Sequence, residues 1–168
     1  LCASLVLLMT IPGLALFYGG MTRTKSVLNM MMMSFGAMGV VGIIYVLYGY
    51  SMSFGSENVG GIIANPFEKF GLAGTDTIIN PFGYEGYGNI PELAFVGFQL
   101  TFAVITVALI SGAVADRVKF STWMVFAALW VTFAYFPIAH MVWGGGLLSG
   151  AEGGLAAAVF GVTDGVAN

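Results

Sequence analysis

Charged residues are scarce in this chain: Asp, Glu, Lys and Arg make up 8% of its 168 residues, against roughly a quarter in a typical soluble domain. Hydrophobic residues make up 58%. This composition excludes an ordinary soluble globular protein. The formal net charge of −3 is too small to indicate a nucleic-acid partner, so none is expected.

Cysteine and histidine are almost absent as well. Cys2 is the only cysteine, which excludes an internal disulfide and a cysteine-based metal site. His140 is the only histidine. No paired carboxylates, His/Glu metal spacing or serine nucleophile elbow is present. We therefore expect no enzymatic activity, no metal and no cofactor.

Four long stretches lack Asp, Glu, Lys and Arg, namely 1–22, 26–56, 93–115 and 120–151. Each exceeds the roughly 20 apolar residues that a membrane-spanning helix needs. The stretches lack the alternation of barrel strands, so the sequence predicts an all-α, polytopic transmembrane bundle. We expect helices at about 1–20, 28–53, 92–114 and 120–143 in a single membrane domain covering 1–168. The first span has no basic leader, and both ends are expected to continue in a longer protein.

The few charges predict the orientation of the bundle. Four of the five basic residues, Arg23, Lys25, Arg117 and Lys119, lie in the first and third connections. By the positive-inside tendency those connections are cytoplasmic, and the N-terminus is outside. Seven of the eight acids then lie outside, namely Glu57, Glu68, Asp76, Glu85, Glu92, Glu152 and Asp164.

The outer connection 54–91 is rich in Gly, Asn and Pro. It is interpreted either as a cap on the outer face or as part of an entrance. Within the spans, small residues recur and predict close helix packing; they include Ala15, Gly19, Gly36, Gly39, Gly42, Ser111 and Ala115.

Aromatic residues mark the outer third of two predicted helices. Phe98 and Phe102 are four residues apart, so they share a helix face. Trp143 lies about 35 Å along the fourth helix from its start, near the outer surface. These residues fit an interfacial aromatic belt with core packing. They also fit a vestibule that attracts a cation by roughly 0.5–2 kcal/mol per ring.

His140 precedes Trp143 by three residues, in the stretch "PIAHMVWGGG". One interpretation is a chemical site inside the membrane, where ionisable residues are often functional. The other is a helix-packing histidine with one ring nitrogen bonded to a neighbour. In that case Gly144–Gly146 would end the helix.

Three blocks, "IPGLALFYGGMTRTKSVLN" (11–29), "GNIPELAFVGFQLTFAVITVALISGAVADRVKFS" (88–121) and "FPIAHMVWGGGLL" (136–148), resemble the ammonium transporter (Amt/Mep/Rh) family in its bacterial Amt branch. The resemblance covers nearly the whole chain. It implies an eleven-helix, inverted-repeat fold of which this chain is the first four helices. It also implies a homotrimer in the cell membrane with an external N-terminus.

The resemblance also implies roles for three residues. Phe98 and Trp143 match the outer aromatic site that recruits ammonium. Phe102 matches the floor of that site and one of two stacked phenylalanines that gate a hydrophobic pore. The family's two pore histidines lie on later helices, so His140 is not one of them. Asp164 does not match the family's structural aspartate.

The implied function is ammonium or ammonia transport. Two alternatives stay open: a non-transporting ammonium sensor that shares the helical core, and a membrane enzyme that uses the bundle as scaffold. A PII-type signal protein could bind the basic inner connections, although such charges also follow from topology alone.

Overall fold

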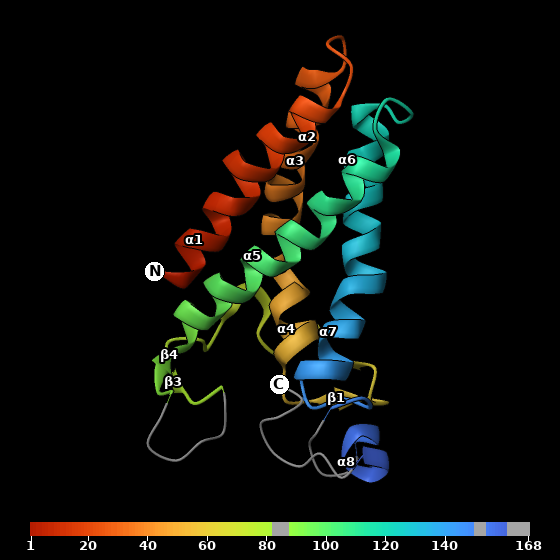
Figure 1. The fold of residues 1–168 in the computed structure, drawn as a ribbon. Helices are drawn as coiled ribbons and strands as arrows, with labels where there is room; N and C mark the ends of the chain where they lie inside the picture. Colours follow the sequence, from red (N-terminus) through yellow and green to blue (C-terminus); the bar gives the residue numbers. More distant parts are fainter. Residues whose placement is uncertain (82–87, 150–153, 161–168) are drawn as a thin grey trace. The chain divides into compact units, whose positions relative to one another are not determined.

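The computed structural model describes residues 1–81, 88–149 and 154–160, and helices dominate it (Figure 1). In these residues four helical spans are long and apolar enough to cross a membrane, namely Cys2–Met21, Val27–Phe54, Glu92–Val114 and Phe120–Trp143. The predicted all-α transmembrane fold is confirmed. The expected ranges differ from these spans by at most one residue at each end. Glu85, Glu152 and Asp164 lie outside the described residues.

Three of the spans contain a wider, π-helical turn between two α-helical parts. The first consists of α1 (Cys2–Leu8), η1 (Met9–Leu14) and α2 (Ala15–Met21). The second consists of α3 (Val27–Ile44), η2 (Tyr45–Gly49) and α4 (Tyr50–Phe54). The fourth consists of α6 (Phe120–Trp130), η5 (Val131–Tyr135) and α7 (Phe136–Trp143). Pro12 lies inside η1, where its missing N–H removes one helical hydrogen bond.

The third span is α5 (Glu92–Ile110), followed by the 3₁₀ turn η4 (Ser111–Val114). The connection before it carries two short antiparallel ladders and the 3₁₀ turn η3 (Phe70–Leu72). One ladder pairs β1 (Asn58–Val59) with β2 (Ile63–Ala64), and the other pairs β3 (Ile78–Ile79) with β4 (Ile90–Pro91). Helix α8 (Leu155–Phe160) follows the fourth span.

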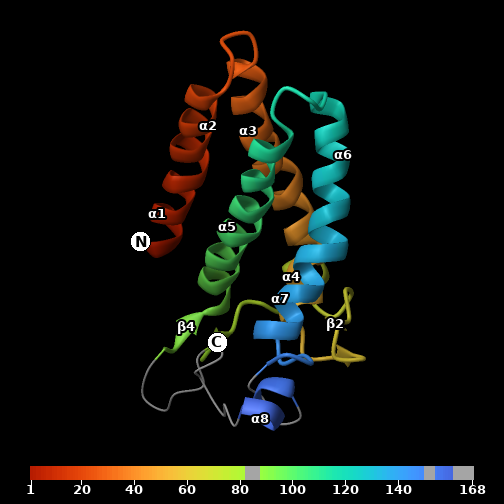
Figure 2. The ribbon, with the colours of Figure 1, turned by 45° about the vertical axis from the view of Figure 1, so that its right-hand side comes forward.

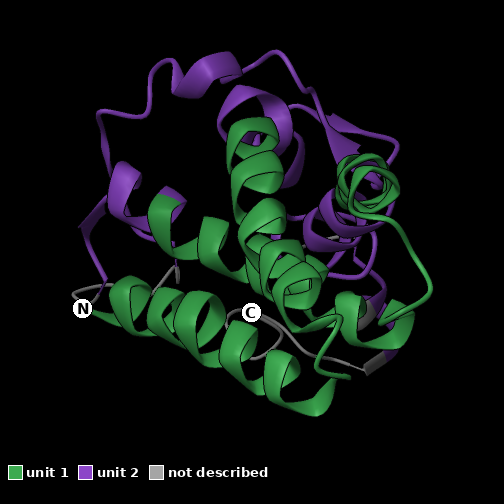
Figure 3. Cartoon of the chain, turned by 90° about the horizontal axis from the view of Figure 1, so that it is seen from above, with its two compact units in different colours: residues 1–45, 97–131 green, residues 46–96, 132–168 purple. Residues whose placement is uncertain are grey.

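The chain divides into two compact units, coloured separately in Figure 3. Unit 1 consists of residues 1–45 and 97–131, and unit 2 consists of 46–96 and 132–168. Unit 1 therefore holds α1, α2, α3, α6 and most of α5. Unit 2 holds α4, α7 and the outer connection.

In unit 1, α3 packs against α2 and α6 (Figures 1 and 2). The buried indole of Trp123 donates a hydrogen bond of 2.9 Å to the carbonyl of Met33. A Cβ at Gly36 would lie 2.7 Å from the sulfur of Met124, so the predicted close approach occurs there. Gly39 and Gly42 face open space among the described residues.

In unit 2, α4 packs against α7 and β2. The hydroxyls of Tyr48 and Thr132 are hydrogen-bonded at 2.9 Å, which joins η2 to η5. Next to this contact the Phe136 ring lies directly on Gly49, where a Cβ would come within 2.7 Å of a ring carbon. The second and fourth spans are therefore in tight contact within this unit.

Candidate functional site

The two phenylalanines predicted for the site meet on α5. The ring centroids of Phe98 and Phe102 are 4.9 Å apart and their planes are at 75°, an edge-to-face arrangement that aromatic quadrupoles favour. Both side chains are half-buried. Their carbonyl oxygens accept hydrogen bonds of 2.6 and 2.7 Å from the hydroxyls of Thr101 and Thr106. These polar hydroxyls are therefore satisfied inside an apolar helix.

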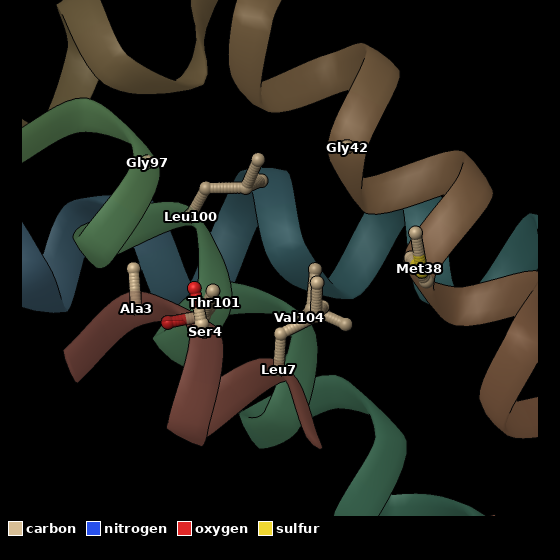
Figure 4. Close-up of a pocket in the computed structure, with 9 residues that line it drawn as sticks. All are labelled: Ala3, Ser4, Leu7, Met38, Gly42, Gly97, Leu100, Thr101 and Val104. Atoms are coloured by element: carbon tan, nitrogen blue, oxygen red, sulfur yellow. The ribbon is translucent and has the colours of Figure 1, made fainter. Parts of the chain in front are cut away.

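A different face of α5 borders a cavity of about 270 Å³ in unit 1 (Figure 4). Its lining consists of Ala3, Ser4, Leu7, Met38, Gly42, Gly97, Leu100, Thr101 and Val104. The α5 members of this set recur at helical spacing. Phe98 and Phe102 are not among them, so the aromatic pair and the cavity belong to separate faces of the helix.

Trp143, the third predicted site residue, is the last residue of α7. Its side chain is 46% exposed, which leaves much of the indole free to meet a ligand. Immediately after it the chain turns, because the N–H groups of Gly144 and Gly146 both donate to the carbonyl of His140, each at 3.0 Å. The predicted end of the helix at the glycine triplet is confirmed.

The His140 side chain is completely buried in unit 2. Its Nδ1 lies 3.1 Å from the carbonyl oxygen of Ser53, near the end of α4. No described residue pairs with its Nε2. The structure thus agrees with a packing histidine that has one ring nitrogen bonded to a neighbour, but the expectation that the side chain is fully satisfied does not hold for Nε2 among the described residues.

A buried polar cluster holds the start of α5. The Glu92 side chain is 2% exposed and forms an ion pair with Lys69. Tyr50 donates a hydrogen bond of 2.7 Å to Oε1 of Glu92, and Thr77 donates one of 2.7 Å to Oε2. The carboxylate also lies in the first turn of α5, where the helix dipole favours negative charge.

Further contacts tie the outer connection to α4. The Ser51 hydroxyl donates to the carbonyl of Asn65 at 2.7 Å and accepts from the backbone N–H of Lys69 at 3.0 Å. The described part of the connection is thus hydrogen-bonded to the end of α4 within unit 2. This arrangement agrees with the interpretation as a cap.

Glu68 organises the first part of the same connection. Partial burial favours its neutral form, but hydrogen bonds from Ser56 and Glu57 and the charge of Lys69 outweigh burial and hold the pKa of the Glu68 carboxyl below its usual value. At neutral pH this carboxylate is ionised and joins two loop segments.

The structure places the three predicted residues on two elements. Phe98 and Phe102 are brought together within unit 1, whereas Trp143 belongs to unit 2. Sequence reasoning missed the cluster around Glu92. The sequence offered one indication of this cluster: Lys69 is the only basic residue in the outer connection, where it could pair with an acid.

The described residues contain no group of three His, Cys, Asp or Glu side chains that could hold a metal ion. Unit 1 offers the half-buried rings of Phe98 and Phe102, and unit 2 offers the exposed ring of Trp143. An aromatic face can attract a small cation without a fixed negative charge.

Comparison with known proteins supports the resemblance seen in the sequence. The model of the Ammonium Transporter Family matches residues 1–159. The chain belongs to the ammonium transporter family. An ammonium transporter of Mycobacterium tuberculosis is 54% identical over a match that covers 83% of this chain and 31% of that protein. An ammonium transporter of Aquifex aeolicus is 48% identical, covering 88% of this chain and 33% of that protein.

Solved structures of the family have the same fold. The crystal structure of Saccharomyces cerevisiae Mep2 matches with a TM-score of 0.70 and 33% identity, over 87% of this chain and 32% of that one. Candida albicans Mep2 matches with a TM-score of 0.69 and 28% identity, over 94% and 31%. This chain therefore spans about a third of the length of the family members that it matches.

Proposed function

We propose that the full-length protein containing this chain transports ammonium or ammonia across the cell membrane. The observation that carries the proposal is the 54% identity, over 83% of this chain, to a protein named as an ammonium transporter. The four long apolar helices supply the membrane-embedded scaffold that such transport requires.

Within this function, Phe98, Phe102 and Trp143 form an outer recruitment site. The edge-to-face pair of phenylalanines and the 46% exposed Trp143 indole support this assignment. Each aromatic face attracts a partly desolvated cation by about 0.5–2 kcal/mol. An attraction of this size concentrates the ion and still lets it leave.

Ammonium gives up part of its water at Phe98 and Trp143 and then meets Phe102, which acts as a gate to a hydrophobic pore. Because ammonium has four N–H groups, it can exchange water for hydrogen-bond acceptors as it moves. Potassium has no such donors and is disfavoured. Residues outside this chain complete the pore.

The same proposal covers topology and assembly. The N-terminus is outside, and the basic connections after the first and third helices face the cytoplasm. The protein forms a homotrimer, and a PII-type signal protein can bind its cytoplasmic face.

Uptake into proteoliposomes tests the recruitment site. In the full-length protein, Trp143→Leu and Phe98→Ala should each raise the half-saturating ammonium concentration by about 2- to 30-fold, as expected for the loss of one cation–π contact. Trp130→Leu is the matched control, because Trp130 is the last residue of α6 and lies in the middle of the fourth span, which continues through η5 and α7 to Trp143.

Uptake is compared under ammonium and potassium gradients. Unchanged ammonium affinity and unchanged selectivity in both site variants would remove the recruitment site. No ammonium-specific signal from a folded wild-type protein would favour the sensor instead.

A further inference from the structure

His140 lies at a junction that determines where α7 ends. Its ring contacts the Ser53 carbonyl near the end of α4, at 3.1 Å, and its own carbonyl accepts the N–H groups of Gly144 and Gly146. Trp143 lies between these contacts, three residues after His140 on the same helix. The backbone on both sides of Trp143 is therefore tied to His140.

The chemistry of the contact assigns the proton. A carbonyl oxygen only accepts hydrogen bonds, so Nδ1 must carry the hydrogen and donate it. In the neutral imidazole Nε2 is then an acceptor, and no described residue pairs with it. A completely buried ring that makes this one directional bond cannot rotate without losing it.

Gly144, the residue after Trp143, leaves no room for the contact between His140 and Ser53 to shift. A Cβ at Gly144 would overlap the Ser53 carbonyl and lie 2.5 Å from Nδ1 of His140. The end of α7 is thus packed directly onto the end of α4. Only a residue without a side chain fits behind Trp143.

We propose that His140 is a positioning residue for Trp143: its Nδ1–H bond to the Ser53 carbonyl fixes the end of α7, and so orients the indole for cation binding. The proposal rests on the proposed recruitment role of Trp143. It assigns His140 no contact with ammonium and no proton transfer.

Two amide substitutions test the bond in the full-length protein. In His140→Asn the side-chain amide N–H occupies the place of Nδ1 and keeps the donor, whereas His140→Gln places its amide near Nε2 and loses it. Gly144→Ala disturbs the contact from the other side. Gly39→Ala is its matched control, because a Cβ there meets nothing within 4 Å.

We expect wild-type affinity in His140→Asn. In His140→Gln and Gly144→Ala we expect a half-saturating ammonium concentration raised by about 2- to 30-fold, the range for loss of the Trp143 contact, with little change in maximal rate. In a Trp143→Leu background His140→Gln should have no further effect on affinity. Such non-additivity shows that two residues act through one interaction.

Normal ammonium affinity in His140→Gln would overturn the proposal, and so would a His140→Asn variant as impaired as His140→Gln. An effect of His140→Gln that adds fully to that of Trp143→Leu would also overturn it. The fourth contrary outcome is that neither His140→Gln nor Gly144→Ala folds. The last result would make the contact a support of the fold alone. Unchanged affinity in Trp143→Leu itself would instead reject the recruitment site.

Discussion

The Glu92 carboxylate is nearly inaccessible to solvent and receives donors from three directions. Lys69 and Thr77 come from the outer connection, and Tyr50 comes from α4. Burying a charge costs several kcal/mol unless partners replace the lost water. This cluster therefore couples the order of the outer connection to the ionisation of one residue.

Lys69→Met should destabilise the protein, because it leaves the buried Glu92 carboxylate without its cation. We expect a loss of about 1–3 kcal/mol in the free energy of unfolding, below the value for a fully buried pair because Lys69 is 24% exposed. Thermal unfolding in detergent measures the effect. Lys25→Met, at an exposed lysine, is the control, and equal melting temperatures for both variants would contradict the prediction.

At the scale of elements, the close contact of η2 with the start of α7 depends on a missing side chain. Gly49→Ala would push a methyl group into the Phe136 ring. Overpacking of this kind costs about 1–3 kcal/mol. We expect a lower melting temperature in detergent.

The control for Gly49→Ala is Gly42→Ala, a helical glycine whose Cβ would meet nothing within 4 Å. The same substitution is thus made in two helical positions that differ in available space. A stability loss shared by both variants would show that helix chemistry, and not the Phe136 contact, is responsible.

The spans were predictable from the sequence, but their buried faces were not. In α3, Met33 is completely buried whereas Met32 is 45% exposed. Lipid is as apolar as a protein core, so the same residue types suit both faces of a transmembrane helix. Composition therefore locates such a helix without indicating which side packs.

For the candidate site too, contacts within one helix were predictable from the sequence, whereas contacts between distant segments were not. The four-residue spacing placed Phe98 and Phe102 together, as the structure confirms. The partners of Glu92 were not predictable, because Lys69 and Thr77 lie 23 and 15 residues before it. Such pairs form only when a loop folds back onto a helix start.

At the scale of the whole molecule, the basic residues predict which side each connection faces. In a cysteine-free background of the full-length protein, which includes Cys2→Ser, Asp76→Cys should react with a membrane-impermeant maleimide on intact cells. Lys25→Cys should react only after permeabilisation. Both positions are exposed, so their reactivity reports the side of the membrane, and the reverse pattern would contradict an external N-terminus.

The glycine triplet after Trp143 has a consequence for chirality. A Cβ at Gly145 would meet nothing within 4 Å, but the φ of +82° is one that L-residues rarely adopt and that suits a D-amino acid better. At Gly144 and Gly146 an added carbon would run into the backbone oxygens of Ser53 and Gly61. Glycine is therefore required at Gly145 for its backbone conformation, and at Gly144 and Gly146 for lack of space. The three consecutive glycines satisfy two independent constraints.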